Sequence, residues 1–241
     1  MDINFLLEKI SLLSLFIITA TGVFLSIMIG FGLGIYIQRR RKSKKEVKLG
    51  SIIGAMLGLL AFILAFTFGA ATSRFEAKKQ LLLEEVNAIG TTVLRTDFLP
   101  ESKRAEAKDL LKKYVDMRVD VLKNPKMLPQ LIIESEKIQS QLWSQVSLDI
   151  NKETDPIRLG LYIQSLNEVI DLHTKRVTVG LQYRIPRVIW VTLYFVTILT
   201  MIAVGYEFGL SGVSNIIISL ILALAFSAVI VLIADLDRGV G

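Results

Sequence analysis

The chain has no cysteine, a single histidine and only five prolines among its 241 residues. Without cysteine it has no disulfide and no thiolate metal site. A lone histidine makes a poor metal site, and no serine or cysteine is arranged with it for nucleophilic catalysis. The sequence also lacks a phosphate-binding loop, separated catalytic carboxylates and any zinc-ligand spacing. These absences argue against an enzyme and indicate no cofactor and no metal.

Charge is missing from four long stretches of the chain. Three of them cover residues 12–37, 49–73 and 188–206, and the fourth ends at Ala234. A helix needs about 20 apolar residues to cross roughly 30 Å of hydrocarbon. We therefore predict an all-α membrane protein with four transmembrane helices. The polar stretch between the second and third helices is large enough to form an inserted helical-bundle domain.

This pattern predicts three parts. Residues 1–73 hold the first two transmembrane helices and a basic loop, residues 74–187 form the soluble helical domain, and residues 188–241 form a transmembrane hairpin, with a tight turn at Glu207 to Val213. The net charge of +6 is concentrated next to the membrane segments, where it indicates topology and contact with lipid head groups. The lipid bilayer is thus the expected partner, and nucleic acid is not.

Basic residues also predict the orientation. The loop after the first helix carries seven Lys or Arg between Arg39 and Lys48, and short basic loops stay in the cytoplasm. Seven further Lys or Arg flank the membrane segments on the opposite face, so the totals are equal. We favour a cytoplasmic basic loop, because domains longer than about 60 residues translocate largely regardless of their charge. Residues 74–187 are then extracytoplasmic.

Residues 50–100 are expected to form one long helix that leaves the membrane. Its apolar half carries two rows of small residues at four-residue spacing, which let helix backbones approach closely in lipid. Such rows pack either laterally within one subunit or around the axis of a homo-oligomer. The predicted packing residues are Gly50, Gly54, Gly58, Ala61, Ala65 and Gly69.

Phe62 and Phe66 lie one turn apart on this helix. A ring of such side chains around a symmetry axis can gate ions by dewetting, although aromatic pairs at this spacing are also common in cores. An ion channel is therefore one hypothesis, and a non-conducting membrane scaffold or sensor whose helical domain binds a partner is the alternative. Anions are slightly favoured, because basic residues surround one predicted mouth: Arg74, Lys78, Lys79, Arg184 and Arg187.

The polar domain shows four stretches with apolar residues at helical spacing. His173 lies on the fourth stripe, where it is either a buried structural residue or a pH sensor. Asp235 and Asp237 follow the last transmembrane helix and either bind a cation in an oligomeric ring or form a solvated helix end. The stripes are Leu82, Val86, Ile89 and Val93; Leu110, Tyr114, Met117 and Val121; Ile138, Leu142, Val146 and Ile150; and Leu159, Ile163, Leu166, Ile170, His173 and Val177.

Several segments together resemble the bestrophin-like domain family of bacterial membrane proteins, over nearly the whole chain. They are GAMLGLLAFILAFTF at 54–68, SRFEA at 73–77, EEVNAIGTTVLRTDFLP at 84–100, LNEVIDLHTKRV at 166–177, YRIPRVIW at 183–190, YEFGLSG at 206–212 and DLDR at 235–238.

The resemblance implies kinship with bestrophins, which are pentameric anion channels whose second membrane helix lines the pore with a hydrophobic neck. Phe62 and Phe66 fall where neck residues are expected, and the resemblance places the protein in a bacterial inner membrane. Two features differ. Bestrophins keep their soluble part in the cytosol, whereas the basic loop here predicts the reverse, and the sequence shows no bestrophin-type acidic calcium clasp beyond Asp235 and Asp237. In addition, the family motif usually reads DLDRP where this chain has Gly239.

The orientation can be tested by cysteine labelling, because the chain has no cysteine of its own. We expect Asn124→Cys to react with an impermeant maleimide added from outside the cell, and Ser43→Cys to react only after the membrane is permeabilised. The reverse pattern would show that the orientation is wrong.

Overall fold

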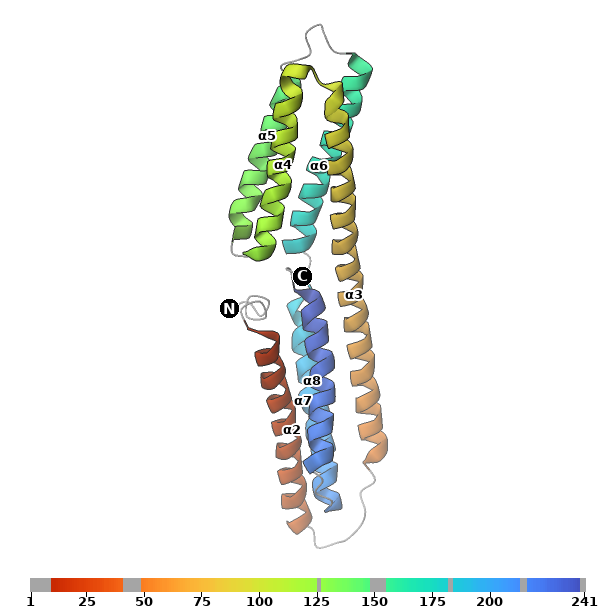
Figure 1. Cartoon of the computed structure of the whole chain (residues 1–241). Helices are drawn as coiled ribbons and strands as arrows, with labels where there is room; N and C mark the ends of the chain where they lie inside the picture. The colour runs from red at the N-terminus through yellow and green to blue at the C-terminus, as the bar shows by residue number, and fades with distance from the viewer. Residues whose placement is uncertain are drawn as a thin grey trace. The chain divides into compact units, whose positions relative to one another are not determined.

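The computed structural model describes residues 10–40, 49–124, 127–147, 155–181, 184–212 and 216–238. Within these ranges all regular structure is helical (Figure 1). Predictions that concern residues 41–48 of the basic loop, Ser43 among them, or Ile150, fall outside the description. The helices are α2 (Leu12–Arg40), α3 (Gly50–Arg95), the short 3-10 helix η1 (Thr96–Phe98), α4 (Glu101–Lys123), α5 (Leu128–Ser147), α6 (Pro156–Leu181), α7 (Arg187–Ser211) and α8 (Ile216–Asp237).

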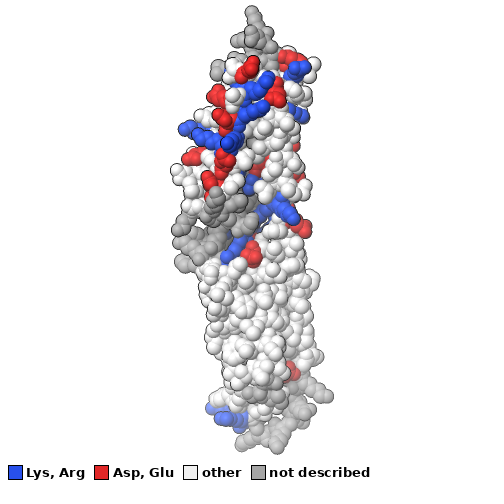
Figure 2. Space-filling model, in the orientation of Figure 1, with Lys and Arg blue, Asp and Glu red and all other residues white. Residues whose placement is uncertain are grey.

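Four of these helices are long and apolar enough to cross a membrane, namely α2, α3, α7 and α8. The prediction of an all-α protein with four such helices is confirmed, and α3 is a single helix of 46 residues. The chain divides into two units. Unit 1 lies within Met1–Phe75 and Arg184–Gly239, and unit 2 lies within Glu76–Tyr183, so α3 contributes to both. Figure 2 shows a broad zone without charged residues on unit 1 and many charged side chains on unit 2.

Unit 1 is built on a close contact between α2 and α7. Gly30 and Gly34 of α2 face Gly205 and Gly209 of α7. A Cβ atom added at Gly30 would lie 2.0 Å from the carbonyl oxygen of Ile202, which is well inside van der Waals contact. Only glycine lets the two backbones come this close, and in lipid such packing replaces the hydrophobic effect as the source of helix association.

One sequence prediction for α7 is wrong. The turn expected at Glu207 does not begin there, because α7 continues to Ser211 and ends at Gly212, whose φ of 68° is left-handed. The helix continues because its last turns pack on α2 through Gly209, and Gly212 supplies the usual glycine stop. Near the start of α7, the side chain of Trp190 is fully buried in the core of unit 1.

Unit 2 has one apolar core formed by α4, α5, α6 and the second part of α3. The predicted stripes of α5 and α6 are buried at the positions that the structure describes, or half-buried in the case of Ile163, Ile170 and Val177. On α4 the side chain of Val121 lies outside the description; of the other predicted stripe positions, Tyr114 is fully buried, whereas Leu110 and Met117 are half-buried.

The stripe predicted for the second part of α3 is wrong at two positions. Leu82 and Val86 are 44% and 56% exposed, whereas Glu85 and Thr92 are buried. The apolar periodicity is correct at Ile89 and Val93 but misplaces the buried face at the earlier turns, because that face carries a charged residue that is paired inside unit 2.

The α2–α7 contact predicts unequal effects for two alanine substitutions on α2. Gly30→Ala places a methyl group against the backbone of α7, and we expect a loss of roughly 1–3 kcal/mol, the usual cost of overpacking. Gly32→Ala is the matched control, because no atom of the described residues lies within 4 Å of a Cβ at Gly32. Thermal unfolding of the two purified variants in detergent measures the difference, and equal midpoints would contradict the close contact.

Candidate functional site

Within unit 1, one face of α3 packs against the other helices. Its buried residues are Ile53, Leu60, Leu64, Thr67 and Ala71, spaced seven, four, three and four apart. This spacing follows the 3.6-residue repeat and defines a single narrow stripe. Leu60, Leu64 and Ala71 belong to the core of unit 1.

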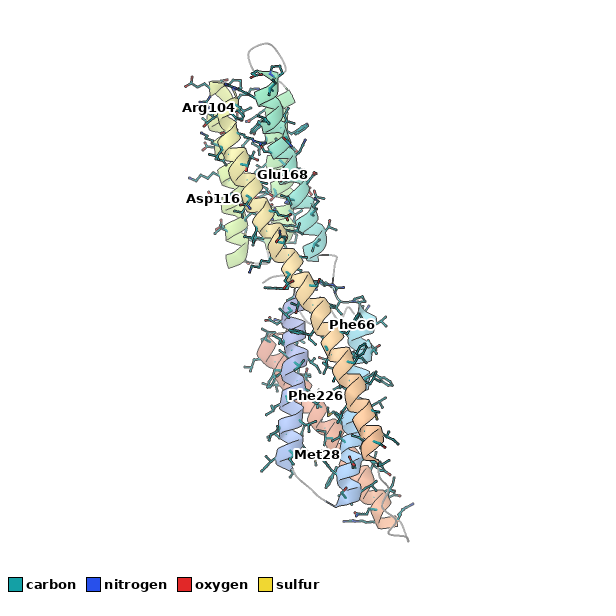
Figure 3. The ribbon with its side chains drawn as sticks, turned by 90° about the vertical axis from the view of Figure 1, so that its right-hand side faces the viewer. Met28, Phe66, Arg104, Asp116, Glu168 and Phe226 are labelled. Carbon is teal, nitrogen blue, oxygen red and sulfur yellow. The ribbon has the colours of Figure 1, made fainter. Side chains whose placement is uncertain are left out.

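The opposite face of α3 is exposed. Phe62 and Phe66 are 68% and 63% exposed. Phe62 lies about 200° around the helix from the buried Leu60, since successive residues are about 100° apart. Both phenylalanines therefore project away from the other helices of unit 1. Figure 3 labels Phe66 on this helix.

The predicted packing residues lie on or beside the exposed face. Among the described residues, no atom lies within 4 Å of a Cβ added at Gly54, Gly58 or Gly69. A Cβ at Gly50 would meet only the Glu207 carboxylate, at 3.6 Å. Ala61 and Ala65 are exposed as well. These small residues make no close helix contact of the kind that joins α2 and α7, so their role in helix packing stays a prediction about contacts beyond the single chain.

This face of α3 differs from the exposed faces of the other membrane helices. The exposed residues of α2 and α8 include large aliphatic side chains such as Ile17, Ile29, Leu220 and Ile221, which suit contact with lipid tails. The exposed face of α3 carries a row of small residues beside Phe62 and Phe66, together with the exposed Leu59. Small residues are typical of helix interfaces and not of lipid-facing surfaces. They are Ser51, Ala55, Gly58, Ala65, Gly69 and Ser73.

The two aspartates after the last membrane helix have different surroundings. Asp235 is exposed, whereas Asp237 is only 6% exposed. The Oδ1 atom of Asp237 accepts a hydrogen bond of 3.0 Å from the backbone N–H of Ile185 and lies 3.6 Å from the Arg74 guanidinium. Asp237 therefore joins the end of α8 to the middle of α3 and to the segment before α7. The described residues hold no group of three or more potential metal ligands.

Unit 2 contains a buried carboxylate that sequence reasoning did not find. Glu85 of α3 is 1% exposed, and three side chains hold it. The Tyr114 hydroxyl and the Arg118 guanidinium, both from α4, donate to Oε1 over 2.5 and 2.8 Å. Arg176 of α6 donates to Oε2. Buried carboxylates are tolerated when they are paired and hydrogen-bonded in this way, so Glu85 ties α3 to both α4 and α6.

His173 of α6 completes this cluster, which we call the Glu85 cluster. His173 is 2% exposed, in agreement with the prediction of a buried structural residue. Its Nδ1 atom accepts a hydrogen bond from Arg118. Burial and the positive charge of Arg118 lower the pKa of His173 to about 4. Burial acts to raise the pKa of Glu85, but Arg118, the Tyr114 hydrogen bond and Arg176 outweigh it and lower that pKa.

A signal for the Glu85 cluster is present in the sequence. Arg118 follows Tyr114 by four residues and Arg176 follows His173 by three, so each arginine shares a helix face with a residue on a predicted stripe. Because both arginines are charged, they lie outside the apolar stripes that predict the core. A carboxylate on the buried face of a third helix becomes visible only when the helices are packed together.

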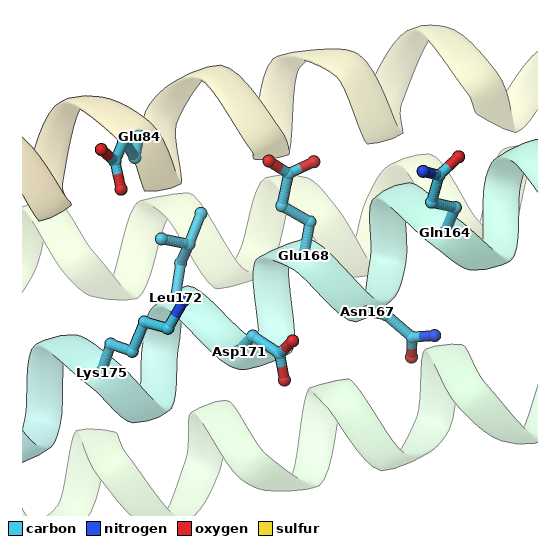
Figure 4. A pocket seen from close by; sticks show the side chains of 7 residues that line it. All are labelled: Glu84, Gln164, Asn167, Glu168, Asp171, Leu172 and Lys175. Carbon is cyan, nitrogen blue, oxygen red and sulfur yellow. The ribbon is translucent and has the colours of Figure 1, made fainter.

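Figure 4 shows an open pocket of about 430 Å³ between α3 and α6. Acidic and amide side chains dominate its lining, and most of them are exposed to solvent. The pocket therefore lacks the buried, converging polar groups of a typical small-molecule site. Its lining residues are Glu84, Gln164, Asn167, Glu168, Asp171, Leu172 and Lys175.

The fold and these sites define an all-helical membrane protein, and comparison with known proteins gives its family. The bestrophin-like domain model matches residues 23–239, so the chain belongs to the bestrophin-like family. A similar solved structure is that of a bacterial bestrophin homolog from Klebsiella pneumoniae carrying a point mutation. The match has a TM-score of 0.64 and 16% sequence identity, and it covers 90% of this chain and 89% of that one. At this identity the likeness shows a shared fold. No curated protein matches the sequence.

The Glu85 cluster predicts a large effect from a conservative substitution. Glu85→Gln leaves two half-buried arginines without their buried carboxylate, and breaking a buried ion pair in this way costs roughly 3–5 kcal/mol. Glu84→Gln is the matched control, because Glu84 is the neighbouring residue and is exposed. Denaturant unfolding at pH 7, monitored by the far-ultraviolet circular dichroism of the helices, compares the stability of both variants with that of the parent. Equal stability of the two variants would contradict the pairing.

Proposed function

We propose that the protein is one subunit of a homo-oligomeric ion channel and that the first part of α3 lines the pore. The observation that carries this proposal is the exposed face of α3. Phe62 and Phe66 lie there, opposite the stripe that packs within the subunit. Copies of this face arranged around an axis would bring the phenylalanines into a ring.

Such a ring can control conduction without any charge. A narrow apolar constriction loses its water, and an ion cannot shed its hydration shell to cross it, so the pore conducts when the constriction widens and wets. Gly58 and Gly69 lie on the same face and allow close approach of neighbouring helices. The lack of charged residues within the membrane segments is compatible with this mechanism, whereas transporters and proton relays usually need them.

The family supports the same reading. A solved structure with a similar fold is that of a bacterial bestrophin homolog, and bestrophins are the anion channels that the sequence resembles. A preference for anions is the finer part of the proposal. We expect it to be modest, because Asp237 lies 3.6 Å from Arg74 and offsets its charge. We further propose that unit 2 is the helical domain inserted between the second and third membrane helices, outside the bilayer of a bacterial inner membrane and on its extracytoplasmic side.

Chloride flux from liposomes tests the pore. We expect Phe62→Ala and Phe66→Ala each to raise the flux severalfold over the parent, because a smaller side chain widens and wets the constriction. The matched control is Phe195→Ala on α7. Phe195 is 60% exposed and lies beside the exposed Val191 and Leu199, so its truncation changes a lipid-facing surface and should leave the flux at the parent level.

The assembly is measured alongside the flux. Native mass spectrometry in mild detergent should give the same homo-oligomer for the parent and all three variants. A monomer in every detergent would refute the pore. If none of the four proteins conducts chloride although the oligomer is intact, the non-conducting scaffold is favoured. If all three truncations raise the flux equally, the helix bundle is destabilised and Phe62 and Phe66 do not form a gate.

A further inference from the structure

His173 is held in one protonation state by its position in unit 2. Its Nδ1 atom accepts a hydrogen bond from Arg118, and an arginine can only donate. Nδ1 therefore carries no proton, and the single proton of the neutral ring lies on Nε2. The same guanidinium nitrogen of Arg118 also donates to Glu85. Neutral His173 thus helps to hold Arg118 of α4 against α6 and against the carboxylate of α3.

Protonation of His173 would remove this bond. A proton on Nδ1 turns the acceptor into a donor, so that two N–H groups and two positive charges would face each other. The surroundings give little compensation. Arg118 and Arg176 face one carboxylate, Glu85, so the cluster already carries one net positive charge before His173 is protonated. With a side chain only 2% exposed, His173 has almost no solvent to screen a second positive charge.

Among the described residues of unit 2, Glu85 is the carboxylate that acts on the imidazole of His173. From α4 the groups facing His173 are Tyr114, whose hydroxyl lies 3.4 Å from Nδ1, and Arg118. From α3 the group is Glu85, and from α6 itself it is Arg176. The charged residues of α5 in its described part are all exposed, namely Glu134, Glu136 and Lys137.

We propose that unit 2 is an acid-sensitive module, in which protonation of His173 breaks the Arg118–His173 bond and releases α4 from α6. The Glu85 cluster joins α3, α4 and α6, so the loss of this bond weakens the packing of unit 2 where these three helices meet. The proposal does not depend on ion conduction. If unit 2 lies outside the cytoplasm, as proposed above, the cluster responds to the pH outside the cell.

The sign of the pH dependence follows from the two states of the imidazole. Burial and Arg118 lower the pKa of His173 to about 4 in the folded protein, against an ordinary value of 6.5. The unfolded chain therefore takes up a proton first as the pH falls. The contribution of His173 to stability is complete above pH 6.5 and is lost as the pH falls from 6.5 towards 4. The unfolding equilibrium constant rises by up to about tenfold per pH unit in this window.

Nuclear magnetic resonance of the imidazole tests the first step directly. His173 is the only histidine, so protein labelled with ¹⁵N-histidine gives one imidazole signal in the full-length chain. We expect the pattern of a neutral ring with its proton on Nε2 from pH 7.5 down to at least pH 5. A ring that titrates near pH 6.5, or that carries its proton on Nδ1, would overturn the proposal.

A stability measurement tests the consequence. In His173→Asn the amide oxygen lies near the position of Nδ1 and can accept from Arg118, but it does not titrate. We expect the parent to lose stability steeply between pH 6.5 and pH 4.5, with faster amide exchange in α4, and His173→Asn to lose much less. The control Thr174→Asn changes the next, exposed residue and should keep the parent's pH dependence.

The pH range of the stability measurement distinguishes the titration of His173 from that of Glu85. The ordinary pKa of Glu85 is 4.5, and its pKa in the folded protein is lower, so Glu85 contributes to acid lability chiefly below this range. If His173→Asn and the parent share the same pH dependence, the proposal is wrong. Where His173→Asn does not fold, the imidazole signal of the parent decides the question alone.

Discussion

The contact between α2 and α7 is the constraint on which unit 1 depends. Four glycines bring the two backbones together, with a distance of 2.0 Å between a Cβ added at Gly30 and a carbonyl oxygen of α7. Helices in lipid gain little from hiding apolar side chains, so contact of this kind supplies much of the attraction. Since α2 and α7 pack closely against each other, α3 contacts the other helices of unit 1 along one narrow stripe. Its far face is exposed and carries a row of small residues beside Phe62 and Phe66.

Unit 2 relies on a different kind of interaction. Its apolar core is ordinary for a helical bundle, but the buried face of α3 carries a carboxylate that two arginines and a tyrosine satisfy. Buried charges of this sort add little net stability compared with apolar packing, but they are costly to break and they fix which residues face one another. The Glu85 cluster thereby sets the rotation of α3 in unit 2 and keeps Leu82 and Val86 on the outside.

The two units therefore present different chemistry for function. In unit 1 the exposed face of α3 is free of charge and offers a surface suited to an apolar constriction. In unit 2 the Glu85 cluster brings a buried carboxylate, two arginines, a tyrosine and an imidazole together at one site. A channel of the bestrophin-like family needs a hydrophobic barrier for ions and a way to respond to its surroundings. We propose that this chain provides the first through Phe62 and Phe66 and an acid response through His173.

The sequence by itself determined the class of protein and the membrane segments, because hydrocarbon tolerates only long charge-free helices and these are visible as runs of residues. It also identified the continuous helix from Gly50, the buried position of His173 and the stripes of α5 and α6, which depend on local periodicity. It did not determine the partners of His173, the burial of Glu85 or the end of α7. Those features depend on which faces of distant helices meet, since Glu85, Arg118 and Arg176 come from three separate segments. Only the tertiary structure decided that the glycines of α2 and α7 pack within the chain, whereas Gly54, Gly58 and Gly69 of α3 face outward: the spacing of small residues is the same in both cases, and only the helix opposite each face distinguishes them.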